Sequence, residues 1–241
     1  MEAIWNFEIT ITLFLQSLGS WLTVPMKAFT FLGQEEFFML ILPALYWCIN
    51  PGLGIQVGAL LMLSTSINGY FKMAMHGARP YWFNTAVKPG VFETSFGMPS
   101  GHAMNSMSIW GLIGSFLKST RGKVLAGLVI LFIGLSRIYL GVHFTSDVLV
   151  GWALGAVLLF VFIRWQRPVT AWAKKLSLAG QVVVSLISAL ALVVINALVV
   201  ALFGSWVVPE TWVQNAALAN PDELIAPYSV TGILTSAGTW F

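Results

Sequence analysis

The chain has 241 residues, of which 58% are hydrophobic, 14% aromatic and only 9% charged, and its formal net charge is +3. Soluble domains carry roughly 25% charged and about 45–50% apolar residues, so this composition excludes an ordinary soluble enzyme, a disordered tail and a nucleic-acid-binding protein with a basic face. With a mean hydropathy of +0.84, it predicts an all-α, polytopic integral membrane helix bundle with roughly six to eight spans.

The first apolar run covers residues 4–24 and is interrupted by Glu8, Gln16 and Gly19. It lacks the basic start and the small-residue cleavage site of a signal peptide, and we expect it to span the membrane rather than lie in the interface. Further apolar runs follow at 35–49, 54–71, 101–117, 124–141, 147–163 and 178–208. Glycines that favour close helix contacts in lipid stand at Gly111, Gly114, Gly127, Gly134, Gly141, Gly151 and Gly155.

Basic side chains orient the predicted spans. They gather in two short segments, which contain Lys118, Arg121 and Lys123, and Arg164, Arg167, Lys174 and Lys175. Because two spans separate these segments, both lie on one membrane face, which the positive-inside rule identifies as cytoplasmic. Alternation then places residues 76–100 and 142–147 on the outer face. The acidic residues Glu35, Glu36, Glu93, Glu210, Asp222 and Glu223 also fall on predicted outer segments.

The first group of candidate functional residues follows the run 54–71. Lys72, His76 and Arg79 are spaced by four and three residues, so we expect them on one helix face, and Pro80 is expected to end that helix. Snorkelling at the membrane interface explains any one of these residues taken alone. Several ionisable side chains from different segments that lie at the same depth in the membrane instead indicate a functional site.

The second candidate segment is Pro99-Ser100-Gly101-His102, where the run 101–117 begins. Ser100 is expected to cap the helix, and the free N–H groups of a helix N-terminus, with a glycine for close approach, suit a bound anion. A capped helix start without any function has the same pattern, so this segment indicates a site only in combination with others.

The third candidate segment joins two predicted spans. Arg137 lies near the outer end of one span, and Gly141 is expected to end that helix. His143 and Asp147 are four residues apart, so on a helix they share a face, where the carboxylate can fix the tautomer of the imidazole and stabilise its charged form. An isolated pair of this kind is more often structural, but the cations and the second histidine at the same depth favour catalysis.

Taken together, the three segments resemble the signature of the type 2 phosphatidic acid phosphatase superfamily. The matching residues are Lys72-x6-Arg79-Pro80, Pro99-Ser100-Gly101-His102 and Ser136-Arg137-x5-His143-x3-Asp147. The resemblance implies a six-span membrane phosphatase core over residues 1–165. The extension over 166–241 is expected to hold one further span at 178–208, an acidic outer loop and the possible start of another helix at 230–241. Its layout is similar to that of the longer sphingosine-1-phosphate and glucose-6-phosphate phosphatases.

The resemblance also implies a role for each residue of the signature. His143 would attack phosphorus, Asp147 would orient that imidazole, and His102 would protonate the leaving group and then activate water. The expected substrate-binding residues are Lys72, Arg79, Ser100, Gly101 and Arg137. His76 is not part of the signature, and it is expected either to support the site or to be a solvated interfacial histidine.

The expected function is hydrolysis of a lipid phosphate monoester at the outer face of the inner membrane, or at the luminal face in an organelle. The phosphatidic acid, phosphatidylglycerophosphate and sphingoid-base phosphate classes are the expected substrates. Alternatives are a polyprenyl diphosphate or sugar-phosphate phosphatase, a phosphotransferase, and a non-catalytic phospholipid carrier. We expect no cofactor and no metal, because three cations surround the site and Asp147 is the only carboxylate expected near it.

Overall fold

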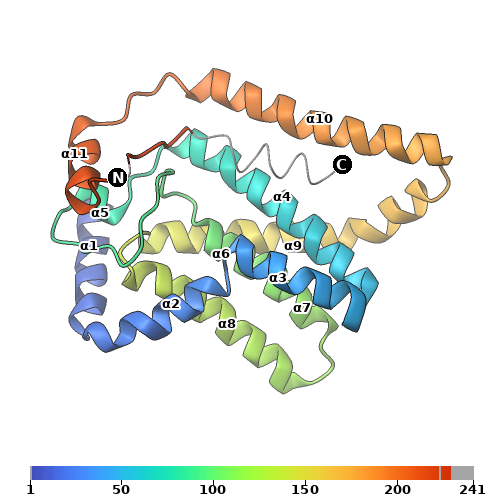
Figure 1. Ribbon diagram of the computed structural model, residues 1–241, viewed down its shortest axis with the longest axis horizontal. Helices are drawn as coiled ribbons and strands as arrows, with labels where there is room; N and C mark the ends of the chain where they lie inside the picture. Colours follow the sequence, from blue (N-terminus) through green and yellow to red (C-terminus); the bar gives the residue numbers. More distant parts are fainter. Residues whose placement is uncertain (1, 223, 229–241) are drawn as a thin grey trace.

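The computed structural model describes residues 2–222 and 224–228. All regular structure within these residues is helical, which confirms the all-α prediction (Figure 1). The long helices are α4 (Pro51–Met75), α8 (Thr120–Tyr139), α9 (Thr145–Ala173) and α10 (Leu178–Phe203). The short ones are α1 (Glu2–Ser17), α2 (Thr23–Phe31), α3 (Glu35–Ala44), α5 (Pro80–Phe83), α6 (Gly101–Asn105), α7 (Gly111–Phe116) and α11 (Glu210–Ala219). The helix start predicted at 230–241 lies outside the described residues.

Three of the described helices, α8, α9 and α10, are long and apolar enough to cross a membrane by length and composition. They coincide with the runs predicted at 124–141, 147–163 and 178–208. The run 54–71 forms most of α4, which carries polar side chains such as Ser64 and Asn68 on its buried face. The runs 35–49 and 101–117 form short α-helices continued by π-helical turns, Leu45–Ile49 (η2) and Ser106–Trp110 (η3). The predicted number of six to eight spans therefore stays a prediction.

The run predicted to span the membrane at residues 4–24 is bent, and whether it spans stays a prediction. The chain turns by 90° between α1 and the segment Ser20–Phe31, which starts with the short 3-10 helix η1 (Ser20–Leu22). Gly19 makes this bend possible, because its φ of +112° is a backbone conformation that residues with a side chain rarely adopt. If the bent pair is one broken span, the number of spanning helices rises from three to four.

Helix α9 continues well beyond the run predicted for it. It extends to Ala173 and contains Pro168, so the boundary expected at residue 165 lies inside a continuous helix. The division into a core and an extension stays a prediction.

Helix α10 packs beside α4. Tyr70 of α4 donates a hydrogen bond of 2.7 Å to the carbonyl of Leu192 in α10.

Small residues bring α6 against α9. A Cβ atom added to Gly151 would lie 2.6 Å from the Ser100 carbonyl oxygen, and one added to Gly155 would lie 2.6 Å from that of Met104. Only glycine permits this approach, as the sequence predicted for lipid-buried helices. Gly127 is different, because no heavy atom lies within 4 Å of its added Cβ, and the expected close contact is absent there.

The topology gathers the candidate residues at one end of the bundle. Helix α8 ends and α9 begins at residues 139–145, and the C-terminus of α4 and the start of α6 reach the same end (Figure 1). The two basic segments lie at the other ends of α8 and α9. The candidate site and the basic segments are therefore separated by the length of the helices.

Candidate active site

The end of α4 differs from the predicted helical stripe. The helix stops at Met75, and His76 takes a left-handed conformation with φ of +48° while its N–H donates to the Lys72 carbonyl. Arg79 therefore belongs to a loop rather than to the same helix face as Lys72. The close contact of Gly77 with Met98, where an added Cβ would approach within 2.6 Å, packs this turn against the segment before α6.

Arg79 is fully buried and holds the loop before α6 in place. Its guanidinium donates to the carbonyls of Ser95 at 2.7 Å and Phe96 at 3.2 Å, and to that of Val142 at 2.9 Å. Lys72 reaches the same loop, since its Nζ donates to the Ser95 hydroxyl at 2.8 Å. The two cations of the first segment are thus fixed by a common partner, Ser95.

The second segment starts α6 as predicted. The Ser100 side chain caps the helix by accepting from the Ala103 N–H at 3.4 Å, and the Ser100 N–H donates to the Asp147 carbonyl at 3.0 Å. This backbone bond ties the start of α6 to the start of α9. Nε2 of His102 is buried and has no hydrogen-bond partner among the described residues. An unpaired polar atom of this kind is available to a bound molecule.

The third segment pairs His143 with Asp147 at the start of α9. The Asp147 carboxylate lies 3.2 Å from His143 Nδ1 and accepts from the Phe144 N–H at 2.9 Å. Arg79 Nη1 lies 3.4 Å from the other ring nitrogen, Nε2. Because an arginine can only donate, this contact leaves Nε2 as an acceptor and places the proton of the neutral ring on Nδ1, facing Asp147.

The charge state of His143 follows from its surroundings. The ring is almost completely buried, and burial, followed by the positive charges of Arg79 and Arg137, holds the pKa of His143 well below its usual range. The imidazole is therefore neutral at pH 7. A neutral ring that carries its lone pair on Nε2 is the form that acts as a nucleophile once the substrate displaces the contact with Arg79.

Arg137, at the end of α8, is paired with a carboxylate that the sequence analysis did not place in the site. Its guanidinium forms an ion pair with Glu93 and donates to Thr30 Oγ1 at 2.6 Å. Arg79 also approaches Glu93, at 3.6 Å. Burial raises the pKa of Glu93, but Arg79 and Arg137 outweigh that effect and hold it far below its ordinary value. The Glu93 side chain is therefore a carboxylate.

These segments surround one polar cavity of about 360 Å³. Its lining residues are Gly33, Gln34, Glu35, Glu36, Asn68, Lys72, Phe92, Glu93, Gly101, His102, Asn105 and His143. Behind this lining, Arg79 and Asp147 contact His143 directly, and Arg137 contacts Glu93. The three segments of the signature, distant in the sequence, thus meet at a single cavity.

His76 is the candidate that the structure does not bring into the cavity. Its ring stacks on Trp206 with 4.7 Å between centroids, and its Nε2 lies 3.1 Å from the Phe203 carbonyl. His76 therefore contacts the segment after α10. Its expected role in supporting the site stays a prediction without a contact to the other candidate residues.

Sequence reasoning missed Glu93, Ser95 and Thr30. The sole signal for Glu93 was its position in a predicted outer loop, and the expectation that Asp147 is the only carboxylate near the cations is wrong. Nothing in the local sequence pairs Ser95 with Lys72 or Thr30 with Arg137. Within the described residues, no group of three or more His, Cys, Asp or Glu side chains is arranged to hold a metal ion.

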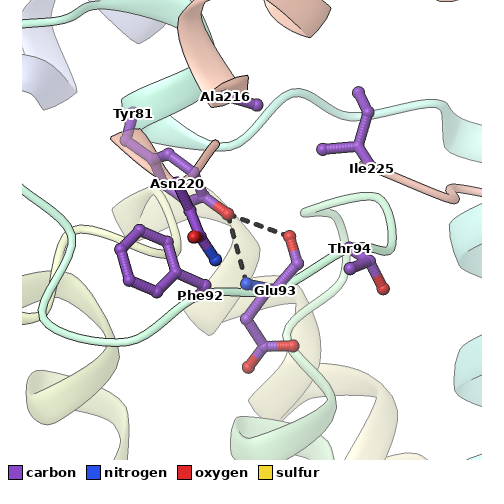
Figure 2. Close-up of a pocket in the computed structure, with 7 residues that line it drawn as sticks. All are labelled: Tyr81, Phe92, Glu93, Thr94, Ala216, Asn220 and Ile225. Atoms are coloured by element: carbon purple, nitrogen blue, oxygen red, sulfur yellow. Dashed lines mark hydrogen bonds between the residues drawn. The ribbon is translucent and has the colours of Figure 1, made fainter. Parts of the chain in front are cut away.

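Tyr81 fixes the backbone at Glu93, next to a second, smaller cavity. Figure 2 shows its hydroxyl between the two backbone groups of Glu93: it donates to the carbonyl at 2.9 Å and accepts from the N–H at 3.2 Å. The Glu93 carboxylate points away from Ala216 and Ile225, which line the smaller cavity (Figure 2). The loop backbone is thus fixed on one side while its carboxylate faces the arginines on the other.

Comparison with known proteins identifies relatives of this chain. The PAP2 superfamily profile matches residues 53–171. Phosphatidylglycerophosphatase B of Bacillus subtilis is 29% identical over 168 residues, which cover 64% of this chain and 80% of that protein. Human glucose-6-phosphatase 3 is 30% identical over 183 residues, 66% of this chain, but the chain spans only 53% of that relative's length. The crystal structure of a transmembrane PAP2 type phosphatidylglycerolphosphate phosphatase from Bacillus subtilis superimposes with a TM-score of 0.61 at 27% identity, covering 70% of this chain and 88% of that one.

Proposed function

The chain belongs to the PAP2 superfamily of membrane phosphatases, and from this premise we propose that it hydrolyses a lipid phosphate monoester through a phosphohistidine intermediate. The observation that carries the proposal is the arrangement at His143. Asp147 contacts one of its ring nitrogens, Arg79 contacts the other, and the ring lines the same cavity as the unpaired imidazole of His102.

In the first step we assign the attack on phosphorus to Nε2 of His143. A bond forms between nitrogen and phosphorus while the ester oxygen–phosphorus bond breaks, and His102 gives a proton to the departing alkoxide. In the second step His102 takes a proton from water, the water oxygen attacks phosphorus, and the nitrogen–phosphorus bond breaks to release inorganic phosphate. Proton transfer of this kind contributes roughly 10²–10⁴-fold to rate.

The remaining residues of the signature are proposed to bind the phosphoryl oxygens. Lys72, Arg79 and Arg137 supply positive charge, and the start of α6 supplies the Ser100 hydroxyl and the Gly101 N–H. Fixed cations favour the five-coordinate phosphoryl group, in which negative charge is spread over the equatorial oxygens. In this proposal the phosphoryl group competes with the Glu93 carboxylate for the two arginines.

A lipid substrate at the outer face is supported by the position of the cavity. It lies at the ends of apolar helices and opposite the two basic segments, which the positive-inside rule assigns to the cytoplasm. Phosphatidylglycerophosphatase B and sphingosine-1-phosphate phosphatase 2, two relatives of the chain, are named for lipid phosphates. We propose the inner membrane with a periplasmic site, or the luminal face of an organelle membrane.

The test is phosphate release by the purified protein in detergent with excess EDTA. The panel contains phosphatidate, phosphatidylglycerophosphate, a sphingoid-base phosphate, undecaprenyl diphosphate and glucose 6-phosphate. We expect release from a lipid monoester, no release by His143→Ala or His102→Ala, and most of the activity in His76→Ala, the matched histidine outside the cavity.

Each result decides part of the proposal. Full activity of His143→Ala would refute the nucleophile, and inhibition by EDTA that Mg²⁺ or Zn²⁺ reverses would refute the metal-independent route. If the protein preferred the diphosphate or the sugar phosphate, the proposed substrate class, a lipid phosphate monoester, would be wrong. Lipid binding without any phosphate release would favour a carrier.

A further inference from the structure

Helix α1 contacts the segment that carries the proposed nucleophile. Trp5 and Glu8 are three residues apart, so they lie one above the other on the same face of α1, and both are buried, with 9% and 6% exposure. Trp5 stacks on Phe144 with 5.5 Å between ring centroids and an angle of 6° between the planes. Phe144 directly follows His143, so α1 packs against the backbone next to the nucleophile.

Glu8 makes two hydrogen bonds to one residue at the start of α9. Its Oε1 accepts from the Ser146 N–H at 2.8 Å, and its Oε2 accepts from the Ser146 hydroxyl at 2.9 Å. The first N–H groups of a helix have no partner within the helix. Asp147 satisfies the Phe144 N–H of this turn, and Glu8 satisfies that of Ser146. Carboxylates are also stabilised at a helix N-terminus by the helix dipole.

These contacts fix the rotation of the first turn of α9. Asp147 is the next residue after Ser146, and its direction toward His143 Nδ1 depends on how this turn is set about the helix axis. A displacement of about 1 Å in a catalytic group costs up to 10²-fold in rate. The hydrogen bonds of Glu8 come from a segment that precedes residues 53–171, the part of the chain that matches the family profile.

We propose that Glu8 is a positioning residue, which acts through Ser146 to hold Asp147 against His143. This inference rests on the proposed function. Glu8 is not a lining residue of the cavity, and its carboxylate bonds to Ser146. We therefore expect its effect to fall on the rate of the chemical steps and not on substrate binding.

The test compares four variants with the wild-type protein for kcat and KM on the preferred lipid. Glu8→Ala should lower kcat about 10–100-fold, as expected for a misplaced catalytic group, with little change in KM. Glu8→Gln should restore most of the rate, because its amide oxygen accepts from the Ser146 N–H and its amide nitrogen donates to the Ser146 hydroxyl. Glu8→Asp keeps the charge but is too short to reach Ser146, and it should resemble Glu8→Ala.

The matched control is Thr12→Val on the same buried face of α1. Thr12 is fully buried, and among the described residues its hydroxyl bonds to the Glu8 carbonyl within the helix, so this variant should keep the wild-type kcat. A wild-type kcat in Glu8→Ala would overturn the inference. So would activity in Glu8→Asp combined with loss in Glu8→Gln, because charge and not placement would then be responsible.

Three further outcomes can be told apart. If Glu8→Ala does not purify as a folded protein, the comparison of Glu8→Gln with Glu8→Asp still decides between placement and charge. If the wild-type protein releases no phosphate from any substrate, the proposed function fails. A wild-type protein that is active while all Glu8 variants match it contradicts the positioning role alone.

Discussion

Two of the walls around the cavity are built in different ways. One is helical and consists of residues 137–147, where α8 ends and α9 begins; the other is the irregular loop over residues 84–99 between α5 and α6. On the helical wall, His143 and Asp147 are set by helix geometry and by the cap on α9. The loop wall depends instead on side chains from elsewhere, above all Arg79, which donates to two of its carbonyls.

This difference separates two functions of the proposed site. The helical wall carries the proposed nucleophile, His143, and Asp147, whose hydrogen bonds to His143 and to the Phe144 N–H are local in sequence. The loop wall carries Glu93 and Ser95, which occupy the cations that are proposed to bind phosphate. We therefore expect changes on the helical wall to lower kcat strongly, and changes on the loop wall to act mainly on anion binding.

Among variants that keep both histidines of the cavity, the largest effect is expected from Asp147→Asn on the helical wall. Asparagine keeps the size of the side chain and an oxygen for the Phe144 N–H, but it removes the charge that stabilises the ring of His143 once nitrogen is bonded to phosphorus. We expect kcat to fall about 10²–10⁴-fold, with KM changed far less, as measured by phosphate release. An unchanged kcat would show that the carboxylate has no part in the reaction.

The second prediction concerns the pH dependence of kcat/KM, because Arg79, which holds the loop wall, also affects His143 on the helical wall. Protonation of His143 removes its lone pair, so activity is lost as pH falls through the pKa of this ring. Burial, followed by the charges of Arg79 and Arg137, lowers that pKa, and the acidic loss is therefore expected below about pH 6.5. Replacement of Arg79 by Gln removes one of these charges, raises the pKa of His143 and moves the loss of activity to higher pH.

The measurement is the pH profile of kcat/KM for both proteins on the same lipid. Ionisation of the substrate phosphate affects both profiles equally, so the difference between them reports on the enzyme. A profile for Arg79→Gln that coincides with the wild-type profile, or lies at lower pH, would contradict the proposed coupling between Arg79 and His143.

Glu93→Gln tests the loop wall with a smaller expected effect. Glutamine has nearly the same shape, but it no longer neutralises Arg79 and Arg137, so an added anion meets less competition. We expect inorganic phosphate to inhibit about 10-fold more tightly, which corresponds to about 1.4 kcal/mol. Glu35→Gln is the matched control, because Glu35 also lines the cavity but accepts its hydrogen bond from Thr65. Weaker inhibition in Glu93→Gln would mean that Glu93 helps to bind the anion.

Much of the fold was predictable from composition and periodicity. Runs of apolar residues located α8, α9 and α10, because a lipid-buried helix needs an uninterrupted apolar surface. The same signal did not reveal the 90° bend within residues 4–24, because that bend depends on one backbone conformation, at Gly19, within an otherwise apolar run. The apolar run also ended at residue 163, although α9 continues to Ala173, because a helix can extend beyond the part of its sequence that is apolar enough for lipid.

The candidate site was predictable in its helical parts. The spacing of four residues correctly placed His143 near Asp147, although His143 precedes α9, and the capping pattern correctly started α6 after Ser100. The loop wall was not predictable, because an irregular segment has no period from which the direction of a side chain follows. The partner of the two arginines, Glu93, is set by tertiary contacts alone.

The smallest expected effect belongs to Tyr81→Phe, which loosens the loop wall without touching a charge. Phenylalanine keeps the buried ring but loses both hydrogen bonds to the Glu93 backbone, each with a net value of about 0.5–1.5 kcal/mol. Because Arg79 still holds Ser95 and Phe96, the loop should shift only near Glu93. We expect a change of roughly 2–10-fold in the inhibition constant for phosphate, on the scale of one such bond, with kcat almost unchanged. A loss in kcat as large as that of Asp147→Asn would show that the two walls act as one rigid unit and would remove the distinction between them.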